Sequence, residues 1–171
     1  MGKIKCIFFD FDGVFLDSYN PNRKVTNFLS RYVGGKKDLP LVPDMKKVIE
    51  NVAGEYMLCI ISSSGTATIR SFLEAHGLRS YFTDIVGYEL AAGKAKKMKH
   101  IMFEHGLASE QCVFITDTVA DIKEAHQAQV RVLAVSWGHD PAHELVEADP
   151  EAIIRQPAEI SAWLAHAKQC K

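Results

Sequence analysis

The chain has 171 residues, of which 47% are hydrophobic and 24% charged, and its 20 basic and 21 acidic residues give a net charge of −1. This length predicts one domain with a substantial core. The balanced charge excludes the strong electrostatic attraction by which basic proteins bind nucleic acid or anionic membranes.

Short apolar runs alternate along the chain with segments of helical periodicity. This alternation predicts an α/β fold around a parallel sheet. The runs are continuously hydrophobic, which is typical of strands covered by helices on both faces. We therefore expect a three-layer α/β fold with about five strands, at residues 4–9, 57–61, 82–86, 113–116 and 130–135.

Four helices are predicted from apolar residues spaced three and four apart. Two of them begin near Pro43 and Pro157, since proline suits the first turn. The other two end at Gly77 and Gly106, which can take the left-handed conformation that follows a helix. The expected buried residues are Met45, Val48, Ile49 and Val52; Ile69, Phe72 and Leu73; Met98, Ile101 and Met102; and Ile160, Trp163 and Leu164.

The segment 19–42 does not fit this alternation and contains at most one short helix. We interpret it as a minimal cap-like insertion in a single domain that spans residues 1–171. The polar residues at its start could contact a ligand or could equally be solvated; they are Tyr19, Asn20, Arg23 and Lys24.

The cysteines are scattered, and they form no C-x-x-C pair (Cys6, Cys59, Cys112 and Cys170). This pattern predicts free thiols in a reducing compartment. The apolar run near the N-terminus is too short for a signal peptide or a membrane span. We expect a cytoplasmic protein without a membrane partner.

Polar residues follow several of the predicted strands, where ligands bind in open parallel α/β sheets. Clustered carboxylates repel each other unless a cation neutralises them, and hard oxygen ligands favour Mg²⁺. A carboxylate beside such a metal can be a nucleophile for phosphorus, while a hydroxyl and a lysine can hold a phosphoryl group. The residues are Asp10, Asp12, Ser62, Ser63, Ser64, Lys94, Asp117 and Asp121.

With these residues the chain resembles the haloacid dehalogenase (HAD) superfamily of phosphohydrolases. Four motifs occur in the family's order, in the stretches "FFDFDGVFLDS", "LCIISSSG", "AAGKAKKMKHIM" and "VFITDTVADI". The stretch "VRVLAVSWGHDPAHEL" is similar to phosphoglycolate-phosphatase-like relatives. The resemblance implies a Rossmann-like, HAD-type sheet. The departure is Thr116, where many relatives have glycine.

The resemblance also implies Mg²⁺-dependent hydrolysis of a phosphate monoester through an aspartyl-phosphate. Asp10 would attack phosphorus, and Asp12 would protonate the leaving oxygen and then help to deprotonate water. Mg²⁺ would be held by Asp10, the backbone carbonyl of Asp12, and Asp117. The remaining implied roles are phosphoryl binding by Ser62, Ser63 and Lys94, and support by Gly13 and Asp121.

The small insertion predicts an open active site, which suits a large substrate or closure by a neighbouring subunit. A small phosphorylated metabolite is the expected partner, and the sequence does not specify which one. A carboxylate at Asp12 favours phosphoryl chemistry over dehalogenation within this family.

Other interpretations of these residues stay open. A phosphorylatable signalling or binding module can carry similar acids, although the order of motifs disfavours it, and a scaffold that has lost catalysis is a third possibility. Asp10 and Asp12 could form a simple turn, and Ser62 to Ser64 could cap the next helix. We expect Lys96, Lys97 and Lys99 to form a solvated helix face. His139 and His143 have a zinc-like spacing, but a loop role is favoured.

Overall fold

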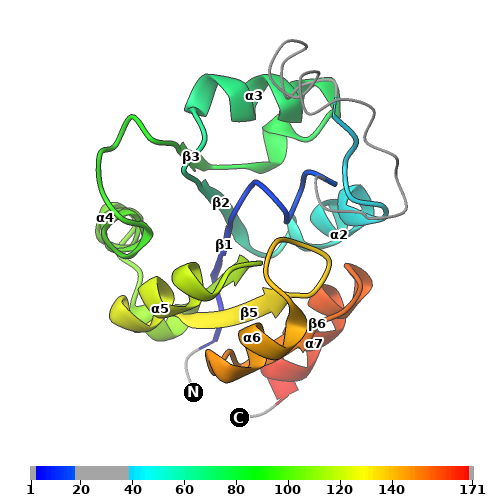
Figure 1. Cartoon of the computed structure of the whole chain (residues 1–171). Helices are drawn as coiled ribbons and strands as arrows, with labels where there is room; N and C mark the ends of the chain where they lie inside the picture. The colour runs from blue at the N-terminus through cyan, green and yellow to red at the C-terminus, as the bar shows by residue number, and fades with distance from the viewer. Residues whose placement is uncertain (1–2, 18–38, 170–171) are drawn as a thin grey trace.

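A computed structural model, which describes residues 3–17 and 39–169, contains a parallel sheet between two layers of helices (Figure 1). The strand order is β3-β2-β1-β4-β5-β6, and every neighbouring pair is parallel. This confirms the predicted α/β class. The strands are β1 Cys6–Phe9, β2 Met57–Ile61, β3 Asp84–Val86, β4 Cys112–Thr116, β5 Arg131–Val135 and β6 Ala152–Ile154.

The sixth strand, β6, corrects the expected number of about five. It has three residues and pairs with the end of β5, with Leu133 opposite Ala152 and Val135 opposite Ile154. Only Ile154 of this strand is buried. A run this short carries no period of its own, so pairing with β5 determines its conformation.

The predicted helical stripes are confirmed, and the helices are α2 Met45–Val52, α3 Thr66–Ala75, α4 Lys94–Glu104, α5 Val119–Gln127, α6 Ala142–Glu147 and α7 Ala158–Gln169. The expected inward residues are buried, except that Trp163 is half-buried. Gly77 and Gly106 have φ angles of 68° and 60°, as expected for residues that follow a helix.

Apolar residues fill the space on both faces of the sheet. Ile7 and Phe9 of β1 pack with residues of α2, α3 and α7, whereas Cys6 and Phe8 pack with residues of α4, α5 and α6. Because successive side chains of a strand point to opposite faces, a strand covered on both sides must be apolar throughout. This explains the continuous hydrophobic run before Asp10.

Most of the predicted insertion, residues 18–38, lies outside the described part of the chain, together with Tyr19, Asn20, Arg23 and Lys24. The described residues on either side of it lie next to each other. Leu16 forms an antiparallel bridge with Leu41, and the Asp17 amide donates to the Pro40 carbonyl over 3.1 Å. The two described ends of this segment are therefore joined at one place.

Cys6, Cys59 and Cys112 are buried and form no disulfide, as the sequence predicts, and Cys170 lies outside the described residues. Within residues 3–17 and 39–169, no helix is both long and apolar enough to cross a bilayer.

Candidate active site

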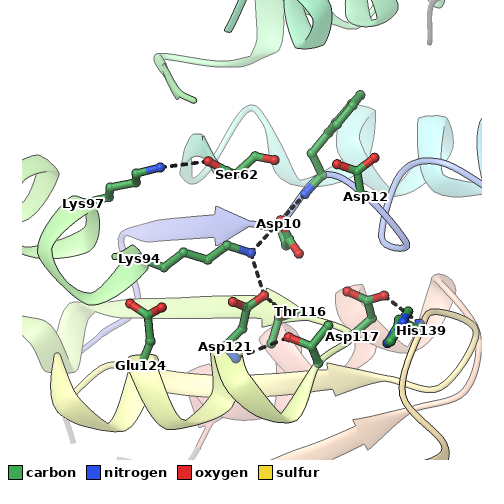
Figure 2. A network of polar contacts seen from close by, with 12 residues as sticks. Asp10, Asp12, Ser62, Lys94, Lys97, Thr116, Asp117, Asp121, Glu124 and His139 are labelled. Carbon is green, nitrogen blue, oxygen red and sulfur yellow. Dashed lines mark hydrogen bonds and ion pairs between the residues drawn. The ribbon is translucent and has the colours of Figure 1, made fainter. Parts of the chain in front are cut away.

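A cleft of about 260 Å³ opens at the carboxyl ends of the central strands. Strands β2, β1 and β4 are neighbours in the sheet, so the polar residues that follow them meet at one edge (Figure 2). All the predicted catalytic, phosphate-binding and metal residues line this cleft. The lining residues are Asp10, Asp12, Ser62, Ser63, Lys94, Asp117, Thr118, Asp121 and His139.

Lys94 connects two buried carboxylates at the centre of the cleft. Its Nζ lies 2.8 Å from Asp10 Oδ1 and 2.6 Å from Asp121 Oδ2. Asp10 Oδ1 also accepts the Phe11 amide over 2.7 Å. These contacts leave the Asp10 carboxylate fixed at the end of β1 and able to turn its other oxygen toward a ligand.

Burial dominates the electrostatics of this pair. It raises the pKa of Asp10 well above the usual range, because the charged carboxylate is desolvated, and the Lys94 ammonium only partly offsets this effect. Burial by itself would lower the pKa of Lys94, but the ion pairs with Asp10 and Asp121 raise it. A site with excess buried negative charge therefore gains by binding a cation.

Asp117 follows β4 and is 1% exposed. Its Oδ2 accepts the His139 amide over 2.7 Å, whereas its Oδ1 is buried and has no hydrogen-bond partner. Burial raises the pKa of Asp117 to about 6. A buried carboxylate oxygen without a donor is unfavourable unless a ligand satisfies it.

Two glycines surround the Asp117 side chain. Gly13 has a φ angle of 80°, and a β-carbon at Gly13 or at Gly138 would overlap the Asp117 carboxylate. Gly13 does not line the cleft itself. The structure thus explains why glycine occupies position 13. Only glycine leaves room for the Asp117 side chain and readily adopts this backbone conformation.

The serines after β2 are joined to Asp12. Ser64 Oγ lies 2.5 Å from Asp12 Oδ2, and the Ser64 amide donates to Ser62 Oγ over 3.0 Å. The alternative that Ser62 to Ser64 cap the next helix is wrong. The α3 N-cap is Gly65, which has no side chain. The Thr66 amide at the start of α3 donates to Glu89 Oε1 over 2.9 Å instead.

Thr116 and Glu124 are functional neighbours that the sequence did not identify. Thr116 Oγ1 donates to Asp121 Oδ2 over 2.8 Å, and Glu124 Oε2 accepts the Ala95 amide over 2.8 Å. Thr116 could be noticed only as a departure from glycine. Glu124 lies three residues after Asp121, so the two side chains share a face of α5, which was the one available signal.

The expectation of a solvated face was right for Lys96 and Lys99, which are exposed, but wrong for Lys97. Lys97 is 3% exposed, and its Nζ donates to the Ser62 and Gly87 carbonyls, each over 2.9 Å. Lys97 follows Lys94 by three residues, so both side chains lie on the face of α4 that turns toward the strand ends.

His139 lines the cleft, whereas the loop role favoured for His143 is wrong, because His143 lies in α6, where its Nε2 is 4.0 Å from Glu144 Oε1. The loop role favoured for His139 fits its position after β5, where its Nδ1 is 2.6 Å from Asp140 Oδ1. Asp140 in turn accepts the Val119 amide at the start of α5 over 2.7 Å. The loop is therefore fixed against α5 and carries His139 to the cleft.

The residues present fit Mg²⁺. Asp10 and Asp117 are buried carboxylates at neighbouring strand ends, and Asp117 has the unpartnered oxygen. Within the described ranges, no three His, Cys, Asp or Glu side chains are grouped to hold a metal by themselves. Such an ion would need a backbone carbonyl and water as further ligands, which is usual for Mg²⁺.

Comparison with known proteins identifies the family of the chain. Residues 17–135 match the family described as haloacid dehalogenase-like hydrolase. The phosphoglycolate phosphatase of Synechococcus elongatus is 24% identical over 123 residues, which cover 71% of this chain and 58% of the relative. The chain thus spans less than two thirds of that relative's length.

Solved structures show the same fold. A haloacid dehalogenase-like hydrolase from Streptococcus pneumoniae superimposes with a TM-score of 0.81 at 23% identity, over 95% of this chain and 99% of that one. The HAD-hydrolase YfnB of Bacillus subtilis, solved bound to magnesium, gives a TM-score of 0.75 at 18% identity, over 95% and 99% of the two chains.

Proposed function

The chain belongs to the haloacid dehalogenase-like hydrolase family, and we propose that it is a Mg²⁺-dependent phosphatase that forms an aspartyl-phosphate on Asp10. The single observation that supports this most is the set of buried groups around Asp10. Lys94 holds its Oδ1 at 2.8 Å, and Asp117, which carries the unpartnered oxygen, directly follows the neighbouring strand β4. A purely structural ion pair would not require that unpartnered acid.

In this proposal Asp10 attacks phosphorus, and the bond to the leaving oxygen breaks. Lys94, Ser62 and Ser63 bind the phosphoryl oxygens and offset the charge that develops in the transition state. Mg²⁺, held by Asp10, Asp117 and the backbone carbonyl of Asp12, would neutralise part of the negative charge. Asp121 orients Lys94 through their 2.6 Å contact.

Asp12 is the proposed proton carrier. It lines the cleft two residues after Asp10, and the Ser64 hydroxyl contacts its carboxylate. It protonates the departing alkoxide in the first step and takes a proton from the attacking water in the second. The contact with Ser64 limits the rotation of the Asp12 side chain. A proton transfer requires such a fixed orientation of the donor.

The substrate class we propose is a small phosphorylated metabolite. The phosphoglycolate phosphatases among the relatives make phosphoglycolate the first compound to test. The described residues that line the cleft are mostly groups for the phosphoryl end and the metal, so recognition of the leaving group depends on other parts of the protein. The segment 19–42 and a second subunit that covers the open cleft are the candidates.

The direct test is phosphate release from an aryl phosphate with and without Mg²⁺. We expect turnover with Mg²⁺, loss of turnover on chelation, and a fall to background for Asp10→Asn. Turnover that is equal in the Asp10→Asn variant would contradict the proposal. Formation of a lasting aspartyl-phosphate without turnover would favour a phosphorylatable signalling module instead.

A further inference from the structure

Lys97 is a buried cation that the proposed mechanism does not use. Its side chain belongs to the inner face of α4 and reaches the loops that follow β2 and β3 (Figure 2). We infer that Lys97 is a positioning residue for phosphoryl binding, which holds Ser62 in place and supplies positive charge behind the phosphoryl site. This inference rests on the phosphoryl binding by Ser62 that is part of the proposed function.

The direct partners of Lys97 are neutral, and Glu124, Glu89 and Asp10 offset its charge only in part and, among the described residues, without an ion pair. In the described part of the chain its Nζ donates to two neutral carbonyl oxygens, those of Ser62 and Gly87. Taking an ammonium out of water without a carboxylate partner is unfavourable, and an apolar side chain would fill the same space at less cost. An anion bound in the adjacent cleft would interact favourably with the charge of Lys97.

The two hydrogen bonds act directly on a phosphate-binding residue. The Ser62 amide donates to the Val86 carbonyl over 3.0 Å, and the Ser62 carbonyl accepts Lys97, so the backbone of Ser62 is held on both sides. Lys97 binds the Gly87 carbonyl at the same time and thereby joins the ends of β2 and β3. The Ser62 side chain is therefore placed by contacts that include Lys97.

The charge of Lys97 adds to that of Lys94. Burial and then the neighbouring Lys94 lower the pKa of Lys97, as expected for two cations that are close together and shielded from water. Asp10 and Asp121 form ion pairs with Lys94, whereas Asp10, Glu124 and Glu89 offset only part of the lowering of the Lys97 pKa. A bound phosphate dianion would relieve the repulsion between the two lysines and so bind more tightly when both are present.

The test measures the affinity for inorganic phosphate, by calorimetry in the presence of Mg²⁺, in the wild type and in Lys97→Met. We expect the dissociation constant to rise about tenfold or more when a charged hydrogen-bonding group is lost. KM for an aryl phosphate should rise in parallel and kcat should change less. Lys97→Arg, which keeps the charge and the donors, should recover part of the affinity.

The matched control is Lys96→Met, which removes an exposed lysine from the neighbouring position of α4 and should leave phosphate affinity unchanged. A folded Lys97→Met protein that binds phosphate like the wild type would overturn the inference. If that variant does not fold, Lys97→Gln keeps donors for the two carbonyls without the charge, and the same comparison decides. A wild type that binds phosphate but hydrolyses no ester would contradict the proposed function and leave this inference standing.

Discussion

At the scale of single residues, the cleft depends on carboxylates whose partners are fixed by neighbours. Asp121 Oδ2 accepts from both Lys94 and Thr116, at 2.6 and 2.8 Å. The second donor reduces the charge that Asp121 presents to Lys94, so the ammonium keeps more of its attraction for Asp10 and for a phosphoryl group. Thr116, which stands where many relatives have glycine, thus contributes to the site through its hydrogen bond to Asp121.

Thr116→Val should lower kcat for an aryl phosphate by up to about tenfold, because Asp121 loses one hydrogen bond in a buried place where water cannot replace it. The substitution keeps the volume and the branched shape of the side chain. Thr116→Ser retains the hydroxyl and is expected to stay near the wild type. Steady-state kinetics of the three proteins provides the check, and equal kcat values for valine and threonine would show that the hydroxyl has no role.

At the scale of elements, the position of Lys94 depends on how α5 meets α4. Lys94 is the first residue of α4, and the N-cap residue Gly93 has no side chain to bind the free amides. Glu124 of α5 performs this function through the Ala95 amide, while Asp121 binds the Lys94 side chain. One face of α5 therefore fixes both the start of α4 and the side chain of Lys94.

Glu124→Ala should reduce the free energy of unfolding by about 1 kcal/mol, which is typical for the loss of a helix cap. Glu124→Gln retains an acceptor oxygen and should cost less. The measurement is urea unfolding, and Lys123→Ala is the control because Lys123 is exposed on the same helix. Equal destabilisation by the Lys123 and Glu124 variants would mean that the cap contributes nothing.

At the scale of the whole molecule, the sheet brings more buried negative charge to one edge than its lysines neutralise. Burial holds the pKa of Asp117 at about 6, above its value of 3.8 when unfolded. A group whose pKa is raised by folding contributes stability below its unfolded pKa, and that contribution is lost as the pH rises through its folded pKa. Asp117 should therefore oppose folding of the metal-free protein at neutral pH.

We expect Asp117→Asn to raise the stability of the metal-free protein relative to the wild type at pH 7.5, by up to about 3 kcal/mol, and to have little such effect at pH 4. Urea unfolding in a chelator at the two pH values gives this difference directly. A difference that is the same at both pH values would contradict the raised pKa.

The same variant tests metal binding at Asp117 without an activity assay. If Mg²⁺ binds at Asp117 in the folded protein, it should raise the melting temperature of the wild type. Asp117→Asn should lose most of this gain, whereas the exposed Asp44→Asn should keep it. An equal shift in all three proteins would place the ion elsewhere.

Some properties of this protein follow from the sequence alone, because they depend on local periodicity and on the order of motifs. The continuous apolar runs specify strands buried on both faces, the stripes specify α2, α3, α4 and α7, and glycine marks the ends of two helices. The order of the polar residues after the strands was enough to predict most of the side chains that line the cleft, although it did not identify Thr118. Parallel strands bring their carboxyl ends to one edge, so sequence order translates into proximity.

Only the tertiary structure decided the rest, because those features depend on contacts between residues far apart in the chain. The strand β6 exists through its pairing with β5, and the burial of Lys97 follows from the two loop carbonyls that it reaches. The close approach of Gly13 and Gly138 to the Asp117 carboxylate is likewise a contact between residues far apart in the chain. A sequence pattern identifies which residues can carry chemistry, whereas the environment that sets their charge and orientation is a property of the folded molecule.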